Sequence, residues 1–299
     1  MRARMNRRQT VKRLEIVVVV AVVTVSLVVG FYLALNTNSS NALDGKPVSQ
    51  PVYTLLYETS KVPYGASNLA YLTNVHSLAG QLFLTNGRPI LVYAGAEYCL
   101  YCAVQRWSLV MALMRFGNFT NLEYMHSGVG DGDYATFTFV ASKYQSNYVA
   151  FQPYEVYDRA GNPLATLPTN YTSAFTQYGK SSFPFLNFAD QYYISGAILD
   201  PAMLGTMNQT QIVSSIQAGG SLASQMKQVA NLMTAVICKT TGSKPASVCG
   251  QDSITALTGT LVSYALPPMS SGTELLLVGA SFTLSPNTFI AGQDYRGWN

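Results

Sequence analysis

A C-x-x-C motif lies between a continuous apolar run and an amphipathic segment, and this order constrains the fold more than any other feature of the chain. Residues 90–96 read ILVYAGA, a nearly all-apolar run that is typical of a buried central strand. Cys99 and Cys102 follow it, and apolar residues then recur at helical spacing as far as Met114. A buried strand that enters a helix through C-x-x-C predicts an α/β fold with both cysteines at the helix N-terminus.

The two cysteines of this motif are placed for thiol–disulfide chemistry. At a helix N-terminus, the Cys99 sulfur faces unpaired backbone N–H groups and the positive end of the helix dipole. Both favour the thiolate, which is the attacking species. Cys102 follows one turn later, close enough to resolve a mixed disulfide, and Leu100 and Tyr101 between them are expected to tune how readily the disulfide is reduced. The motif therefore predicts a redox-active pair.

The C-x-x-C motif has two other uses in proteins. A structural zinc site needs two more ligands at close spacing, whereas Cys238 and Cys249 have ten residues between them and His76 and His126 are the only histidines. We therefore expect no metal, and no motif indicates another cofactor. A static local disulfide without a redox role remains the alternative.

Further strands and helices are predicted around this unit. Asn86-Gly87 is the favoured two-residue turn of a hairpin, because both positions need positive φ. Further strands are expected at 122–126, 136–140, 148–157 and, in a second hairpin, 183–195, and helices at 172–178, 208–217 and 221–238. Strand, C-x-x-C, helix, strand, long insertion, hairpin and helix is the order of a thioredoxin or glutaredoxin core.

Pro184 begins the second hairpin, within the sequence Ser182-Phe183-Pro184-Phe185. In the thioredoxin fold this place is taken by a cis proline that faces the cysteine pair and frames the backbone of a bound peptide. We expect Pro184 to be cis, with an ordinary trans proline at a strand start as the alternative.

Four stretches of the chain together resemble one family, and they run in the order GAEYCLYCAVQRWSL, YVAFQPYEVYD, FPFLNFADQYYISGA and ICKTTGSKPASVC. Over roughly residues 50–250 the chain is similar to domain-of-unknown-function family 929, archaeal thioredoxin-like proteins of which many carry an N-terminal membrane segment. The resemblance implies a thioredoxin-like mixed sheet with a long β-containing insertion and a C-terminal extension, and an exported disulfide-handling protein. Leu100 departs from the family pattern, in which Cys-Pro-x-Cys is usual, and this departure bears on the redox poise.

The N-terminus predicts a membrane anchor. Residues 16–35 hold no charged residue, and a helix of this length spans about 30 Å, the thickness of a bilayer core. Six basic residues lie in residues 1–15, and the positive-inside rule keeps this segment cytoplasmic. A cleaved signal peptide is the alternative, but it has a shorter apolar region and a small-x-small cleavage site, which Leu33-Ala34-Leu35-Asn36 lacks.

The charge distribution argues against nucleic-acid binding. The chain of 299 residues has a formal net charge of +4, with 18 basic and 14 acidic residues. Six of those basic residues and one acidic residue lie in residues 1–15, so the remaining body is close to neutral. It offers no basic patch that could neutralise a phosphate backbone.

These observations predict five regions and an extracytoplasmic location in a single-pass membrane protein. The regions are a cytoplasmic segment (1–15), a transmembrane anchor (16–35), a flexible stalk rich in Asn, Ser, Pro and Gly (36–50), a thioredoxin-like domain (51–220) and a C-terminal extension (221–299). Sequons begin at Asn38, Asn118, Asn170 and Asn208 and are candidates for glycosylation, although chance explains them in a chain rich in Asn, Ser and Thr.

The second cysteine pair is expected to be structural. A bridge between Cys238 and Cys249 would close a loop of about a dozen residues, and four cysteines in two close pairs suit an oxidising compartment. The competing idea is an internal relay that takes electrons from the first pair. Four cysteines allow three pairings, and the sequence alone does not choose among them.

Two charged residues near the motif are candidates for tuning the thiols. Glu97 lies two residues before Cys99 and is placed to tune it or to pair with Arg106, although we expect a surface carboxylate. Trp107 is expected in the core.

The predicted function is a membrane-anchored, extracytoplasmic thiol–disulfide oxidoreductase that forms, reduces or isomerises disulfides. Cys99 would attack or be attacked, Cys102 would resolve, and Pro184 would frame the substrate. The expected partners are exported cysteine-containing proteins or a membrane redox protein that resets the pair. A non-catalytic cell-surface binding or structural domain, with static disulfides on the same scaffold, is the alternative, because fold alone does not imply activity.

Overall fold

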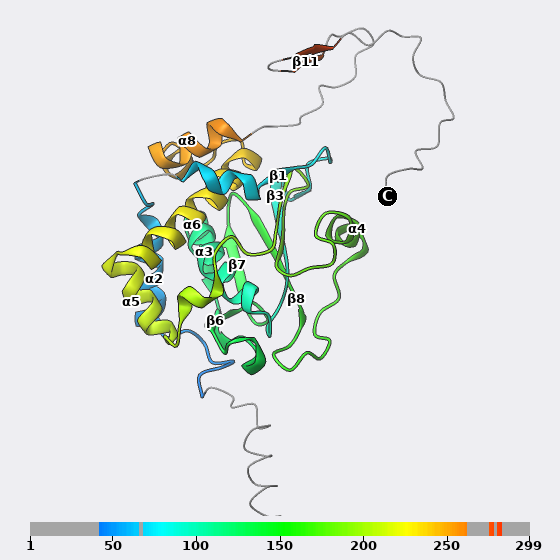
Figure 1. Ribbon diagram of the computed structural model, residues 1–299. Helices are drawn as coiled ribbons and strands as arrows, with labels where there is room; N and C mark the ends of the chain where they lie inside the picture. The colour runs from blue at the N-terminus through cyan, green and yellow to red at the C-terminus, as the bar shows by residue number, and fades with distance from the viewer. Residues whose placement is uncertain (1–41, 66–67, 262–274, 278–279, 283–299) are drawn as a thin grey trace, which may run out of the picture. The chain divides into compact units, whose positions relative to one another are not determined.

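The computed structural model describes residues 42–65, 68–261, 275–277 and 280–282 (Figure 1). The chain divides into a large unit up to Ser263 and a small one from Tyr264, and each is described by itself. The predicted anchor (16–35), the cytoplasmic segment before it and the sequon at Asn38 lie outside the described residues. No helix within the described part of the chain is long and apolar enough to cross a membrane.

A mixed sheet forms the centre of the large unit (Figure 1). Strand β3 (Arg88–Ala96) lies in its middle, parallel to β8 (Ala150–Tyr157) on one side and antiparallel to β9 (Phe185–Phe188) on the other. The sheet is completed by β2 (Leu84–Thr85), β10 (Tyr192–Ser195) and β1 (His76–Ser77), in the order β1-β10-β9-β3-β2 with β8 on β3. This mixed α/β architecture confirms the broad fold class expected from the sequence.

Strand β3 is buried on both faces, which explains why its sequence is almost wholly apolar. Because side chains alternate along a strand, Leu91 and Tyr93 join the main core while Val92 and Ala94 join smaller clusters on the other face. Helices cover both faces of the sheet, so the strand that leads to the cysteines has no solvent-exposed side.

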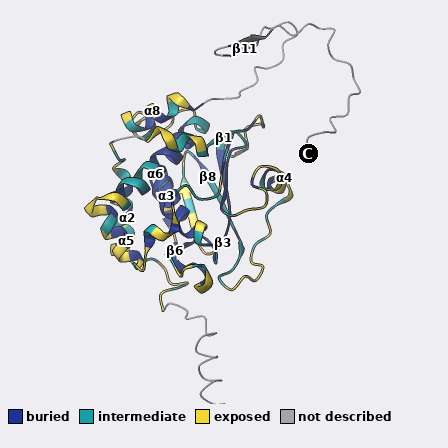
Figure 2. Ribbon diagram, viewed as in Figure 1, coloured by how far each residue is buried: buried dark blue, intermediate teal, exposed yellow. Residues whose placement is uncertain are grey.

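Helix α3 (Leu100–Met114) continues directly from this strand and packs against α6 (Ser221–Thr240) and α2 (Gln50–Lys61). From Cys102 to Met114 every α3 residue is buried, and Figure 2 shows this helix in dark blue beneath its neighbours. On the other face of the sheet, α4 (Thr169–Gln177) packs through Tyr171 and Ala174. The other α-helices among the described residues are α5 (Gln209–Ala218), α7 (Ala246–Cys249) and α8 (Asp252–Thr260). Short 3-10 helices span Leu69–Asn74, Val129–Asp131 and Pro201–Leu204.

The long insertion between α3 and α4 contains two small antiparallel sheets as well as β8. Strand β4 (Gly117–Thr120) pairs with β7 (Lys143–Ser146), and β5 (Glu123–His126) pairs with β6 (Ala135–Thr138). Trp107 donates its indole N–H to the carbonyl of Ala135 and is fully buried, so its predicted core position is confirmed.

The end of the predicted stalk lies against this insertion. Residues 45–48 form backbone hydrogen bonds with Leu122 and Tyr124, and His126 contacts Asp44 at 2.6 Å between Nδ1 and Oδ1. The predicted flexible stalk (36–50) is therefore bound to the insertion from residue 44 onward. In the small unit, β11 (Leu275–Leu277) and β12 (Ala280–Phe282) form a hairpin.

Candidate functional site

The end of β3 and the start of α3 place Cys99 at a helix N-terminus, as predicted. The chain turns within three residues, since the Cys99 N–H donates to the carbonyl of Ala96 at 3.2 Å. Cys99 is the N-cap residue, and its Sγ accepts the backbone N–H of Cys102 at 3.2 Å. The sulfur thereby takes the place of the hydroxyl or carboxylate oxygen that caps most helices.

The surroundings of Cys99 favour its thiolate. The hydrogen bond from the Cys102 thiol is the main cause that lowers the pKa of Cys99 to about 7, and burial of the sulfur opposes it. The backbone N–H of Cys102 and the positive charge of Arg106 lower this pKa further. Near neutral pH, a large share of Cys99 is therefore in the nucleophilic form.

Cys102 has the opposite character. It is fully buried, and this burial raises the pKa of its thiol well above the ordinary value. Cys99 retains 7% of its surface, on the side of a pocket. The pair is therefore asymmetric, with one accessible thiolate and one protected thiol that donates to it.

Pro184 lies beside this pair at the start of β9. The Phe183–Pro184 peptide bond is cis, which confirms the prediction. The Phe183 carbonyl oxygen lies 3.9 Å from the Cys99 sulfur, although 84 residues separate them along the chain. The hairpin thus brings its proline to the cysteine motif, as the element order implied.

A buried ion pair lies beneath the motif. Arg106, one turn beyond Cys102 on α3, donates to both carboxylate oxygens of Glu155 on β8, at 3.1 Å from Nε and 2.7 Å from Nη2. Nη2 also donates to the carbonyl of Ala96 at 2.9 Å, so the pair ties α3 to the ends of β3 and β8. The side chains of Arg106 and Glu155 are 0% and 2% exposed, and bidentate geometry of this kind is what makes a buried pair tolerable.

The expectation of a surface carboxylate at Glu97 is wrong. Glu97 is buried, and its Oε1 accepts the hydroxyl of Thr138 at 2.6 Å. Burial raises the pKa of Glu97, and the Thr138 hydrogen bond opposes the rise. The pairing of Glu97 with Arg106 that the sequence allowed is replaced by the pair with Glu155, because β8 brings that carboxylate under the helix.

A pocket of about 660 Å³ opens beside Cys99. Leu100 and Tyr101, the residues inside the motif, lie on its wall, and Tyr101 is 50% exposed. The opposite wall comes from Phe175 of α4 and Phe183 before the cis proline. An external group can thus reach the Cys99 side of the motif through this pocket.

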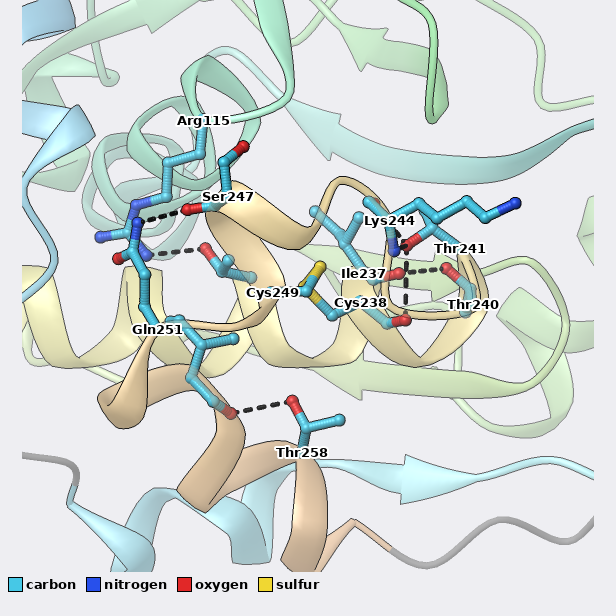
Figure 3. The surroundings of a disulfide bond; sticks show 12 residues. Arg115, Ile237, Cys238, Thr240, Thr241, Lys244, Ser247, Cys249, Gln251 and Thr258 are labelled. Atoms are coloured by element: carbon cyan, nitrogen blue, oxygen red, sulfur yellow. Dashed lines mark hydrogen bonds between the residues drawn. A yellow bond between two sulfur atoms is a disulfide. The ribbon is translucent and has the colours of Figure 1, made fainter.

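Cys238 and Cys249 form a disulfide, with an S–S distance of 1.98 Å, as expected (Figure 3). It joins the end of α6 to α7 beside Arg115, the residue after α3, whose Nη1 donates to Thr234 of α6 at 2.8 Å. Since α3 has 15 residues and each adds 1.5 Å, its two ends are about 22 Å apart. The separation speaks against the proposed internal relay, because direct thiol exchange needs sulfur-to-sulfur contact.

The three described sequons have exposed asparagines. Asn118 lies on β4 and Asn170 on α4, and Asn208 caps α5 by accepting the backbone N–H of Gln211. No cluster of three or more metal-ligating side chains occurs among the residues that the structure describes.

Two residues of the site were not predicted from the sequence. Glu155 and Tyr93 both interact electrostatically with Cys102, and Tyr93 is fully buried on β3. Both lie in strands whose pattern was used only to assign the fold. The signal that was available is a tyrosine within the apolar strand before the C-x-x-C motif and an acid in the strand expected at 148–157.

Comparison with known proteins gives one match. A family model described as Domain of unknown function (DUF929) matches residues 74–239, which is more than half of the chain. The matched segment runs from the residues before β1 to the penultimate residue of α6 and includes the whole candidate site. No curated protein and no solved structure matches the chain.

Proposed function

The chain belongs to the DUF929 family, and we propose that this family member is a thiol–disulfide oxidoreductase that acts through Cys99 and Cys102. The observation that carries the proposal is the asymmetry of the pair. The pKa of Cys99 is lowered to about 7 at the mouth of a pocket, and Cys102 is buried behind it as a protonated donor. A static bridge has no need of such an arrangement, whereas a nucleophile and its resolving thiol require it.

The chemistry is a pair of exchange steps. The Cys99 thiolate attacks one sulfur of a partner disulfide, a Cys99–partner bond forms, the partner's disulfide breaks, and the released sulfur takes up a proton. The Cys102 thiol then loses its proton and attacks the Cys99 sulfur, which releases the second partner thiol and leaves a Cys99–Cys102 disulfide. Two electrons pass from this pair to the partner, and the reverse sequence oxidises a partner dithiol.

The proposal includes a thioredoxin-like fold. It is supported by the succession of a buried strand, the cysteine pair, α3, the parallel strand β8 and the β9–β10 hairpin that follows Pro184. Arg106 and Glu155 are positioning residues in this account, because they fix the end of β3 against α3 and place a charge near both sulfurs.

We also propose that residues 16–35 anchor the protein in a membrane with residues 1–15 in the cytoplasm. The pocket would then meet exported proteins that carry cysteines, or a membrane redox protein that resets the pair. The support is the uncharged run and its basic flank, together with a disulfide at Cys238–Cys249 that suits an oxidising compartment.

A trapping experiment tests the reaction. In cells that express the full-length Cys102→Ser variant, a partner captured on Cys99 cannot be released, so a mixed disulfide should accumulate and disappear on reduction. A Cys99→Ser variant in the same cells is the matched control and should capture nothing. Equal recovery of disulfide-linked protein with both variants would contradict the proposal.

A further inference from the structure

Aromatic residues are the largest group among those that line the pocket beside Cys99. Five of its eleven lining residues are aromatic and come from the residue before the motif, α3, β8, α4 and the segment before β9: Tyr98, Tyr101, Tyr157, Phe175 and Phe183. Aromatic rings bury large apolar areas and pair with other rings at favourable geometry. A groove built in this way favours an apolar or aromatic side chain of an incoming chain.

Most of these rings form one continuous row. Phe175 stacks on Phe183 with ring centroids 5.4 Å apart, and Phe183 meets Tyr157 edge-to-face at 6.1 Å. Tyr157 in turn lies 6.1 Å from Tyr98, the residue before Cys99. The row therefore ends at Tyr98, the neighbour of Cys99 in the chain, and both residues line the same pocket. A side chain laid along the row would lie close to the cysteine that reacts.

The pocket lining carries negative charge and lacks a cation. Asp131 is its one charged side chain, and the Cys99 thiolate adds a second negative group. Arg106 is held by Glu155 beneath the motif, and Arg159 by Asp133 and Asp44. Lys180, which precedes the lining residue Ser181, is exposed and is not itself part of the lining. Glutathione, a small thiol with two carboxylates, would find no cation in the pocket lining.

We infer that the groove takes extended protein segments whose cysteine is flanked by aromatic or aliphatic residues, and that it discriminates against anionic small disulfides. This inference rests on the proposed function and names its substrate class. The row of rings attracts apolar side chains, and Asp131 and the Cys99 thiolate repel anionic groups. The exchange chemistry of Cys99 requires that the bound segment carry a cysteine, as a disulfide when the pair is reduced and as a thiol when the pair is oxidised. Reset of the pair accordingly falls to a protein dithiol or disulfide rather than to a glutathione pool.

The test uses mixed disulfides that share one leaving group. Full-length Cys102→Ser protein in detergent is mixed with a Phe-Cys-Phe peptide, an Asp-Cys-Asp peptide or glutathione, each bound through its cysteine to 5-thio-2-nitrobenzoate. When the Cys99 thiolate attacks the peptide sulfur, a Cys99–peptide bond forms and the coloured thiolate is released. The reaction of each probe with 2-mercaptoethanol in the same detergent corrects for its intrinsic reactivity and for binding to micelles.

The aromatic peptide should react at least about tenfold faster than the acidic peptide or the glutathione probe, which is the rate ratio that one or two favourable ring contacts supply. Tyr101→Ser removes an exposed wall without disturbing the core, and it should reduce this ratio. Tyr178→Ser changes an exposed tyrosine outside the pocket and should leave the ratio unchanged. Asp131→Asn should raise the rate with the glutathione probe.

The two proposals fail in different ways. If no probe reacts faster with the Cys102→Ser protein, which retains Cys99, than with a Cys99→Ser control, the proposed function is wrong. The inference about the substrate class is then wrong as well. Equal corrected rates for all three probes, with normal reactivity at Cys99, would overturn the substrate class alone. If Tyr101→Ser and Tyr178→Ser changed the ratio of aromatic-probe to acidic-probe rates to the same extent, the pocket would not be the source of the selectivity.

Discussion

Cys99 and Cys102 lie at the N-terminal end of α3, whereas the Cys238–Cys249 disulfide lies beside Arg115, which follows its C-terminal end. The first pair caps a helix, borders a pocket and has a thiol whose pKa is lowered to about 7. The second pair is almost fully buried and joins two helices across a short loop. Two cysteine pairs in one unit thus differ in backbone setting and access, and we assign reactivity to one and stability to the other.

The comparison shows that the spacing of two cysteines alone does not determine whether the pair is reactive or structural. What distinguishes Cys99 is its position at a helix N-terminus, where the Cys102 thiol and N–H both donate to its sulfur. Cys238 lies in the last turn of α6 and belongs to the main hydrophobic core, so an incoming thiol cannot reach it without opening the unit.

The largest expected effect is the loss of exchange chemistry on removal of one sulfur. Cys99→Ser should abolish disulfide exchange measured with any thiol-releasing probe, because hydroxyl oxygen does not replace a thiolate in this reaction. The Cys238→Ala/Cys249→Ala double variant should retain the wild-type rate when assayed below its unfolding temperature. A double variant without activity would contradict the assignment of reactivity to the first pair alone.

The buried ion pair beneath the first site should matter next. Arg106→Met leaves Glu155 buried without its partner, which costs about 3–5 kcal/mol of unfolding free energy in denaturant titrations. Because the Arg106 charge lowers the pKa of Cys99, this variant should also raise that pKa, while Glu155→Gln should lower it. Lys143→Met, which removes an exposed cation on β7, should change the unfolding free energy by less than about 0.5 kcal/mol. Shifts of the same sign in the two ion-pair variants would contradict the electrostatic role.

Removal of the second disulfide should destabilise the protein without changing its reactivity. The bridge closes a loop over a sequence separation of 11, and loop-closure entropy for this size corresponds to about 3 kcal/mol. The double variant at Cys238 and Cys249 should show this loss in urea unfolding while the pKa of Cys99 stays at about 7. A shift of that pKa would mean that the two ends of α3 are coupled.

The reactivity of Cys99 should depend on pH as the first pair's geometry implies. A thiol with a pKa of about 7 is protonated below that pH, so alkylation of reduced Cys99 should be roughly a hundredfold slower at pH 5 than above pH 8. Cys102→Ala removes the main hydrogen-bond donor, so the midpoint should move to higher pH. If the pH midpoint of Cys99 alkylation in the wild-type protein lay near that of an ordinary thiol, Cys99 would not be an activated nucleophile.

The parts of the fold that follow from local patterns were predictable. The strand at 90–96, the Asn86-Gly87 turn, the helix after the motif and the hairpin after Pro184 are confirmed, because each is specified by residues close together in sequence. Helix α2 was missed. It begins with a proline in its first turn, and its buried apolar residues are only Val52 and Leu56. So narrow an apolar stripe does not distinguish a helix from an irregular segment at the end of the stalk.

The charged interior of the site was not predictable from spacing. Arg106 and Glu155 are 49 residues apart, and their pairing depends on the parallel register of β3 and β8. Glu97 was placed on the surface because most carboxylates are exposed. Its burial depends on Thr138 of β6, a strand whose packing against the start of α3 no local pattern indicates.

A redox titration of both pairs in one sample tests the central claim most directly. The full-length protein in detergent is equilibrated with graded dithiothreitol, free thiols are alkylated, and the peptides around each cysteine are quantified by mass spectrometry. Cys99 and Cys102 should titrate reversibly within the range of catalytic couples, between about −120 and −270 mV, while Cys238 and Cys249 stay oxidised to below about −300 mV. A first pair that resists reduction to the same low potential as the second would contradict the account.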